Sequence, residues 1–221
     1  MTTRILNQLW SPIAALTSHW DGEVNAQICV GISNASIVPE KPRVLVQIYK
    51  ENYSHLLISK SGAFALNFLS LETTELIKAF GFSSGRHTNK LENVSYTTKT
   101  TGSPILNNCI AYLDCNIINA MDAGDMTCYL EDVLESGMFH IEPLFRIREA
   151  MEAIPEEWNR EWDQHKQYSI NTSREIIDNI SYTPWQTPST RGNAIKYKYL
   201  TPEDFTWVLF DATPAVIMNH I

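Results

Sequence analysis

The sequence has 221 residues, of which 44% are hydrophobic and 19% charged, and its formal net charge is −8. This length suits one domain with an appendage or two small domains, and the composition is that of a globular protein with a sizeable core. An acidic surface repels phosphate backbones, so no nucleic-acid partner is expected. No apolar run reaches the roughly 18 residues of a membrane helix, so no membrane partner is expected either.

The cysteines and the N-terminus together favour a cytoplasmic location. The four cysteines form no C-x-x-C pair, and each lies among apolar or strand-like neighbours. We therefore expect buried free thiols in a reducing cytoplasm. The first residues lack the apolar stretch of a signal peptide.

The first two thirds of the chain have the pattern of strands with few helices. Strands are predicted over residues 12–20, 24–31, 43–49, 63–69, 109–117 and 126–133. Short helices are predicted over 52–59 and 72–80, and loops over 39–42 and 81–89. In the strand at 109–117, one face is expected to hold Cys109, Ala111, Leu113, Cys115 and Ile117. Long strands joined by tight turns predict a mainly β barrel or sandwich.

The pattern changes after about residue 144, so we divide the chain into a domain over 1–143 and an extension over 144–221. Pro155 can begin a helix, in which Glu156 would pair with Arg160. Trp158 and Trp162 lie one turn apart, and a packed face is favoured over a stacking platform. Residues 182–202 contain several prolines and hydroxyl side chains and are predicted to form an extended arm. We expect the extension to pack on the barrel or on a partner subunit, either as a clasp or as a lid.

Several common motifs are absent or lack their structural context. Residues 81–85 match the G-x-S-x-G pattern of a hydrolase nucleophile, but a predicted helix, not a strand, precedes the match, so it is interpreted as chance. The six histidines have no metal-site spacing, and no metal is predicted. Neither a P-loop nor a Rossmann glycine motif occurs.

A series of motifs in order over residues 25–135 resembles the flavin reductase-like family of FMN-binding split barrels. The matching segments are 33–37 before a loop ending at Pro42, F-x-x-N-x-L at 64–69, Asn89-Lys90-Leu91, G-x-P-x-L at 102–106, A-x-L-x-C at 111–115 and Gly124-Asp125-Met126. The resemblance implies a mainly β fold, a Greek-key antiparallel split β-barrel with a few helices. It also implies FMN as cofactor, NADH or NADPH as co-substrate, and a homodimer.

The chemistry of the residues agrees with a flavin phosphate site after the strand at 43–49. Lys50 supplies a point charge, and the helix after it directs free backbone N–H groups at an anion, with Asn52 and Ser54 in its first turn. Capping of that helix by Asn52 or Ser54 is an equally compatible interpretation, and Lys90 is as compatible with a solvated surface lysine as with a flavin contact. The candidate cofactor-binding residues are Cys29, Val30, Gly31, Ser33, Asn34, Lys50, Asn52, Ser54 and Lys90.

Two residues depart from the family pattern. Met126 stands where the family typically has histidine, and Glu131 stands where glycine is common. A thioether cannot transfer protons, so hydride transfer from a nicotinamide is put in doubt more than flavin binding is. The leading hypothesis is an NAD(P)H-dependent flavin reductase acting on a small molecule. The alternatives are an electron carrier of the flavoredoxin type with a redox partner protein, and a flavin-binding module without turnover. No side chain is assigned as catalytic.

Overall fold

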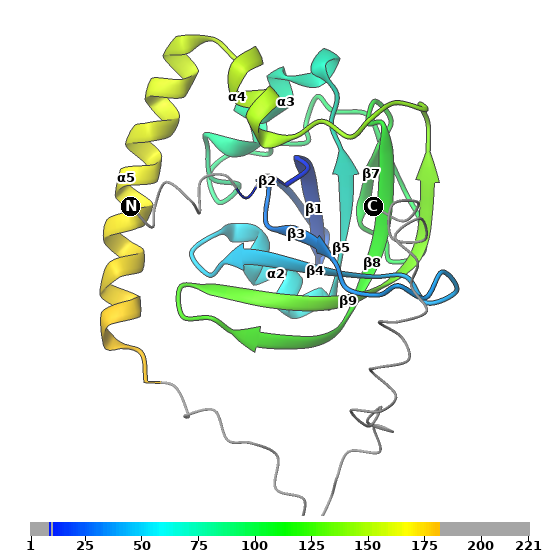
Figure 1. Cartoon of the computed structure of the whole chain (residues 1–221), viewed down its shortest axis with the longest axis horizontal. Helices are drawn as coiled ribbons and strands as arrows, with labels where there is room; N and C mark the ends of the chain where they lie inside the picture. The colour runs from blue at the N-terminus through cyan, green and yellow to red at the C-terminus, as the bar shows by residue number, and fades with distance from the viewer. Residues whose placement is uncertain (1–8, 10, 182–221) are drawn as a thin grey trace, which may run out of the picture. The chain divides into compact units, whose positions relative to one another are not determined.

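The computed structural model describes residue 9 and residues 11–181 of the chain. The strands of a large sheet are β1 (Ala14–Trp20), β2 (Glu23–Cys29), β3 (Ile32–Asn34), β4 (Arg43–Tyr49), β5 (Ala63–Phe68), β8 (Ala111–Asp122) and β9 (Met126–Met138), and a small sheet holds β6 (Tyr96–Thr98) and β7 (Pro104–Leu106). The large sheet has the order β2-β1-β5-β8-β9-β4-β3, and every pairing is antiparallel. It curls into a half-barrel (Figure 1), which confirms the mainly β, antiparallel barrel prediction.

The described helices are α2 (Tyr53–Ser61), α3 (Glu75–Gly81), α4 (Ile147–Ala153) and α5 (Glu156–Asn179), with a 3₁₀ helix, η1 (Leu71–Thr73), before α3. The helix predicted over 72–80 is confirmed for the most part by α3, but its first turn forms the separate 3₁₀ helix η1. Ser70 accepts the backbone N–H of Glu72 at 3.2 Å, while its own backbone N–H is bound by the Thr73 hydroxyl at 3.0 Å. This capping box fixes a tight first turn, and α3 begins only after it.

Both faces of the centre of the sheet are buried. Along β1, Ala14 and Leu16 face one core while Ala15 faces the other, as the two-residue period of a strand requires. We call the cluster inside the curl the barrel core; Ile58 of α2 packs into it. The cluster on the opposite face, against α3 and α4, is the outer core. A strand buried on both faces lacks polar alternation, and all six residues of β5 are accordingly buried.

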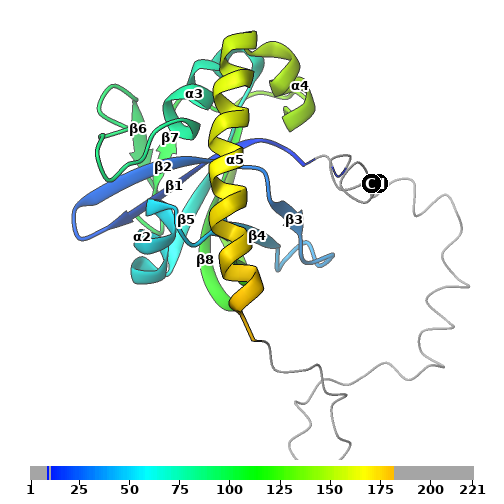
Figure 2. The same ribbon diagram turned by 90° about the vertical axis from the view of Figure 1, so that its left-hand side faces the viewer.

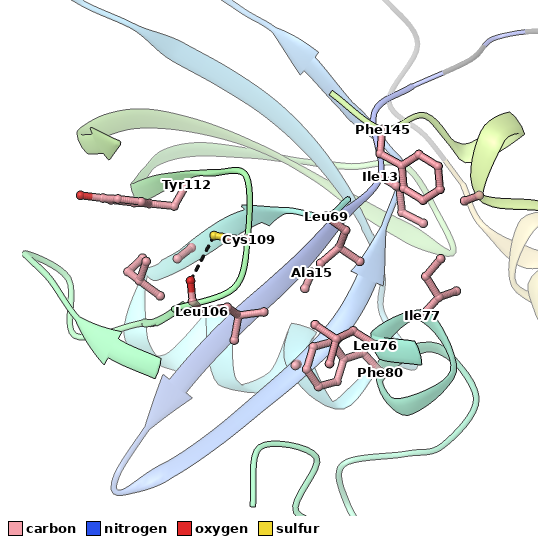
Figure 3. Close-up of a cluster of buried hydrophobic side chains, with 14 of the residues drawn as sticks. Ile13, Ala15, Leu69, Leu76, Ile77, Phe80, Leu106, Cys109, Tyr112 and Phe145 are labelled. Carbon is pink, nitrogen blue, oxygen red and sulfur yellow. Dashed lines mark hydrogen bonds between the residues drawn. The ribbon is translucent and has the colours of Figure 1, made fainter. Parts of the chain in front are cut away.

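The outer core extends into the chain beyond residue 144. Phe145 lies beside Ile13 in this cluster (Figure 3), and its carbonyl accepts the Ile13 N–H at 2.9 Å. Ala150 and Ile154, from α4 and its end, are buried in the same cluster. The described residues up to Ile180 belong to one compact unit. Removing the chain after residue 141 would therefore remove part of the hydrophobic core.

The side-chain alternation predicted over 109–117 is wrong at its start. Cys109 precedes β8 and lies in the outer core together with Tyr112, and its thiol donates to the carbonyl of Leu106 at 3.1 Å. From Ala111 onward the predicted alternation is confirmed, because Ala111, Leu113, Cys115 and Ile117 all pack in the barrel core. The register shift between Asp114 and Cys115 places its extra residue in β9, so it leaves the two-residue period of β8 intact.

Helix α5 has the packed tryptophan face that was predicted. Trp158 and Trp162 both contact Phe82, with ring centroids 6.4 and 5.6 Å apart, and Glu156 pairs with Arg160 at 3.8 Å. The extended arm predicted over 182–202 lies outside the described residues. Over residues 11–181, no helix is both long enough and apolar enough to cross a membrane.

Candidate functional site

The start of α2 lies against the edge strand β2. Ser54, in the first turn of α2, is fully buried, and its Oγ accepts a hydrogen bond from Asn25 Nδ2 at 2.8 Å. The N-cap residue Asn52 makes no side-chain capping bond, and no acidic residue lies in the first turn. The first backbone N–H groups of α2 therefore receive no hydrogen-bond acceptor from the Asn52 side chain. Free N–H groups at a helix start favour the binding of an anion there.

Asn25 was not predicted from the sequence. It is 2% exposed, and its Oδ1 has no hydrogen-bond partner among the described residues. The sequence did contain a sign of its role, since Asn25, Gln27 and Cys29 share one face of a predicted strand. Polar side chains on a buried face need hydrogen-bond partners. The strand pattern alone did not reveal that this face turns toward α2.

The segment from β2 to β3 passes close to β4. The carbonyl of Gly31 accepts the Gln47 N–H at 2.9 Å, and a Cβ on Gly31 would lie 3.0 Å from the Gln47 side chain. Glycine is therefore required for this approach. Next to it, Val30 is half-buried and Cys29 is buried; burial raises the pKa of the Cys29 thiol to about 12, so this thiol stays neutral and is no nucleophile.

Ser33 and Asn34 lie at the other end of this region from Lys50. Asn34 pairs with Val44 in the β3–β4 ladder, and Lys50 follows six residues after Val44. At about 3.3 Å per residue, the two ends are roughly 20 Å apart along β4. The predicted site residues are therefore brought to one region but not to one point, and only an elongated ligand could reach both ends.

An apolar pocket opens beside β3. Its volume is about 380 Å³. The residues that line it are Pro12, Ile32, Ser33, Asn34, Pro42, Arg43, Val44, Phe68, Leu113, Val133 and Leu144. A hollow of this size and character suits an apolar ring or an apolar side chain.

Lys50 is engaged in an ion pair. Its Nζ lies 2.6 Å from Oδ1 of Asp122, the last residue of β8, and the Lys50 side chain is 31% exposed. The hydrogen bond from Lys50 is the main cause that lowers the pKa of Asp122. The charge predicted to meet a phosphate is thus already compensated by a carboxylate.

A histidine and a methionine lie beside this ion pair. His55 Nε2 is 2.9 Å from Thr127 Oγ1, and burial, followed by the charge of Lys50, lowers the pKa of His55. Met126 pairs with Tyr49 at the start of β9. The backbone of Met126, the residue that departs from the histidine of the family pattern, therefore lies beside the strand end that leads into α2.

The loop after α3 brings two more cations to this side of the molecule. Lys90 Nζ donates to the carbonyl of Phe80 at 2.7 Å, and burial lowers the pKa of Lys90 to about 8. Lys90 is thus half-buried and bound to the end of α3, so the surface-lysine interpretation does not hold. Arg86, which sequence reasoning missed, donates through Nη1 to the carbonyl of Glu51 at 2.9 Å, directly before α2.

Helix α5 runs past this region (Figure 2) and contacts it at two points. Trp162 packs on the end of α3, where a Cβ on Gly81 would lie 3.2 Å from the indole. Further along α5, Ser169 Oγ donates to Glu51 Oε1 at 3.0 Å. The helix thereby connects the loop after α3 with the residue that precedes α2.

Glu131 is a carboxyl group in the barrel core. Its side chain is fully buried, and neither oxygen has a hydrogen-bond partner within residues 11–181. Burial raises the pKa of Glu131 to about 9, so the group is a neutral acid at neutral pH.

The donors at the start of α2 fit the phosphate end of FMN. An uncapped helix start and a cation from the neighbouring loop are groups that bind a phosphate, and the buried Ser54 hydroxyl fixes that helix start through Asn25. Among the described residues, no cluster of three or more histidine, cysteine or acidic side chains could hold a metal ion.

Known proteins share this sequence pattern and fold. A ferric-chelate reductase (NAD(P)H) of Archaeoglobus fulgidus is 30% identical over 118 residues, which cover 52% of this chain and 70% of that one. The reductase subunit HsaB of a flavin-dependent monooxygenase from Rhodococcus jostii is 30% identical over 121 residues, covering 55% of this chain and 60% of that subunit. The chain thus spans about 60 to 70% of the length of these relatives.

The fold comparison agrees with these relatives. The FMN-binding protein of Thermus thermophilus superposes with a TM-score of 0.55 at 21% identity, over 59% of this chain and 72% of that one. The curled antiparallel sheet is therefore that of an FMN-binding split barrel. The model of the family described as "Flavin reductase like domain" matches residues 6–144, which is more than half of the sequence. The chain belongs to the flavin reductase-like family.

Proposed function

We propose that the chain binds FMN and acts as an NAD(P)H-dependent flavin reductase. The observation that carries the proposal is the Asn25–Ser54 hydrogen bond, which holds the uncapped start of α2 against β2 beside the close passage at Gly31. The family membership and the reductase names of the relatives support the same chemistry. The flavin, when bound, supplies the hydride and electron transfer.

The chain's own residues would bind and orient the cofactor. Asn52 and the first N–H groups of α2 would hold the phosphate, and the buried Ser54 would fix the helix start through its hydrogen bond with Asn25. The segment from Cys29 to Asn34 would lie along the rest of the molecule, with backbone amides from Val30 and Gly31 near the ring. A single phosphate site at one helix start is what FMN requires, and it supports FMN over the longer FAD.

Anaerobic rapid mixing tests the activity. The FMN-loaded protein is mixed with NADH and, separately, with NADPH, and the flavin absorbance is followed. A reductase predicts loss of the oxidised flavin band within seconds with at least one nicotinamide. No bleaching by either nicotinamide, in a protein that does bind FMN, would contradict it.

A second candidate is a flavin electron carrier that exchanges electrons with a partner protein. The observation that favours it is Met126, which pairs with Tyr49 beside the start of α2 and can neither donate nor accept a proton. A carrier would be bleached slowly by both nicotinamides and rapidly by a reduced redox protein. The same mixing experiment therefore separates the two candidates.

We further propose that the chain is a homodimer in a reducing cytoplasm. The four buried free cysteines support a reducing cytoplasm. Exposed apolar side chains along and after β9 support a subunit interface. The exposed apolar residues are Leu134 (50%), Met138 (62%), Phe139 (50%) and Ile141 (98%). Light scattering on a size-exclusion column at micromolar concentration should give twice the mass of one chain. A monomer would contradict the dimer.

A further inference from the structure

Three cations lie around the start of α2, and two of them are committed elsewhere. Lys50 Nζ is 2.6 Å from Asp122 Oδ1 at the end of β8. Lys90 Nζ is 2.7 Å from the carbonyl oxygen of Phe80 and is half-buried at the end of α3. Moving either cation to a phosphate at α2 would require these interactions to break.

Arg86 is placed differently. One guanidinium N–H donates to the carbonyl of Glu51 at 2.9 Å, and the guanidinium carbon lies 5.5 Å from the centre of the Tyr53 ring. Tyr53 is the first residue of α2. Within residues 11–181, no carboxylate forms an ion pair with Arg86, and the carboxylate of Glu51 accepts from Ser169 instead.

The position of Arg86 is fixed by its neighbour Gly85. A Cβ on Gly85 would lie 2.0 Å from Asn25 Oδ1 and 3.1 Å from Tyr53 Cδ1. The backbone at residue 85 is thus pressed against the same two residues that flank the helix start. The buried amide of Asn25, with its unpartnered oxygen, faces this contact. This contact restricts the backbone position of the loop and therefore of Arg86.

From this geometry we infer that Arg86, and not Lys50, supplies the positive charge that binds the flavin phosphate. The inference rests on the proposed function and names a residue of that same site. A guanidinium carries five N–H donors in a planar fork. One is used on Glu51, so four remain, and neighbouring donors among them can bind two phosphate oxygens. The stack on Tyr53 holds the fork at the helix start, where the backbone N–H groups of α2 complete the phosphate cradle.

The test compares a flavin with a phosphate and one without. Dissociation constants of FMN and riboflavin are measured by flavin fluorescence quenching for the full-length protein freed of flavin and for the variants Arg86→Gln, Arg86→Lys, Lys50→Gln and Lys60→Gln. Lys60 is the matched control, because it loses the same charge at the opposite end of α2. Arg86→Gln should weaken FMN binding about 10- to 100-fold and leave riboflavin binding unchanged. Arg86→Lys should recover part of the loss, and Lys60→Gln should bind both flavins as the parent does.

The outcomes separate the inference from the proposed function. Equal FMN binding by Arg86→Gln and the parent overturns the inference, as does an equal loss of FMN and riboflavin, which would indicate a structural role. If Lys50→Gln, and not Arg86→Gln, causes the selective loss of FMN, the charge belongs to Lys50 and the inference is wrong. If the parent protein binds neither flavin, the proposed function fails and the inference fails with it.

Discussion

Asn25 on the edge strand β2 donates to Ser54 Oγ at 2.8 Å, and both side chains are shielded from solvent. Removing either partner leaves the other buried and unpaired, at a cost of about 1–3 kcal/mol in the free energy of unfolding. We therefore expect Asn25→Ala and Ser54→Ala each to cost that much, and the double variant to cost clearly less than their sum. Urea titration of the four proteins gives the coupling energy directly. Strictly additive losses would mean that the bond does not join β2 to α2.

Gly85 should not tolerate a side chain. Alanine there would place its Cβ 2.0 Å from Asn25 Oδ1, so the loop or Asn25 must move. We expect Gly85→Ala to lower the free energy of unfolding by about 1–3 kcal/mol, as overpacking does. Combined with Asn25→Ser, which removes the clashing amide, Gly85→Ala should cost less than it does alone in the parent. A single Gly85→Ala variant as stable as the parent would contradict the tight contact.

Glu131 should make the fold less stable as the pH rises. Its pKa is raised to about 9 in the folded chain from 4.5, so between these values the folded state holds a proton that the unfolded state has lost. The contribution of Glu131 to the free energy of unfolding is therefore fully present below pH 4.5. It decreases as the pH rises and is lost by about pH 9. At pH 7 the penalty is about 3 kcal/mol, from ~1.4 kcal/mol for each of 2.5 units.

Glu131→Gln keeps the shape and removes the titration. We expect the variant to match the parent near pH 4.5 and to exceed it in thermal midpoint at pH 7 and above. Glu135→Gln on the same strand is the opposite control, because the hydrogen bond from Tyr112 lowers the pKa of Glu135. Its loss should destabilise the protein at neutral pH and matter less in acid. Parallel pH profiles for Glu131→Gln and the parent would exclude a neutral buried acid.

Trp162 should hold α5 against the loop after α3. The indole packs on Gly81 and Phe82, and its removal leaves Ser169 as the hydrogen-bonded contact at Glu51. We expect Trp162→Ala to raise the rate of limited proteolysis within α5 about tenfold through local opening. Tyr168→Ala is the matched control, since Tyr168 lies on the same helix and is 70% exposed. Equal cleavage rates in both variants would show that the tryptophan contact does not hold the helix.

Local patterns predicted several elements of six to nine residues well, whereas β8 and β9 run five residues beyond their predicted ends. The strands corresponding to β1, β4 and β5 and the helix α2 agree with the structure to within about two residues at each end. The three-residue strands β3, β6 and β7 were not predicted, because so short a stretch carries no periodic signal. Cys109 was assigned to the wrong face because it lies in the turn before β8, where the two-residue period of the strand has not begun.

The candidate site could be predicted in part. Lys50, Asn52 and Ser54 do lie around the start of α2, because a helix that follows a strand is a local feature. The ion pair of Lys50 with Asp122 could not be foreseen, since those residues are 72 positions apart. Arg86 was not predicted because it lies in a polar loop, which has no periodic pattern. Its position beside α2 depends on the contact of Gly85 with Asn25, which are also far apart in the sequence.

Calorimetric titration of the flavin-free protein with FMN tests the central claim most directly. The account predicts saturable binding of one FMN per chain, with riboflavin bound at least about tenfold more weakly because it lacks the phosphate that the start of α2 would hold. Failure of FMN to bind at all, or equal affinity for FMN and riboflavin, would contradict a flavin phosphate site at this helix.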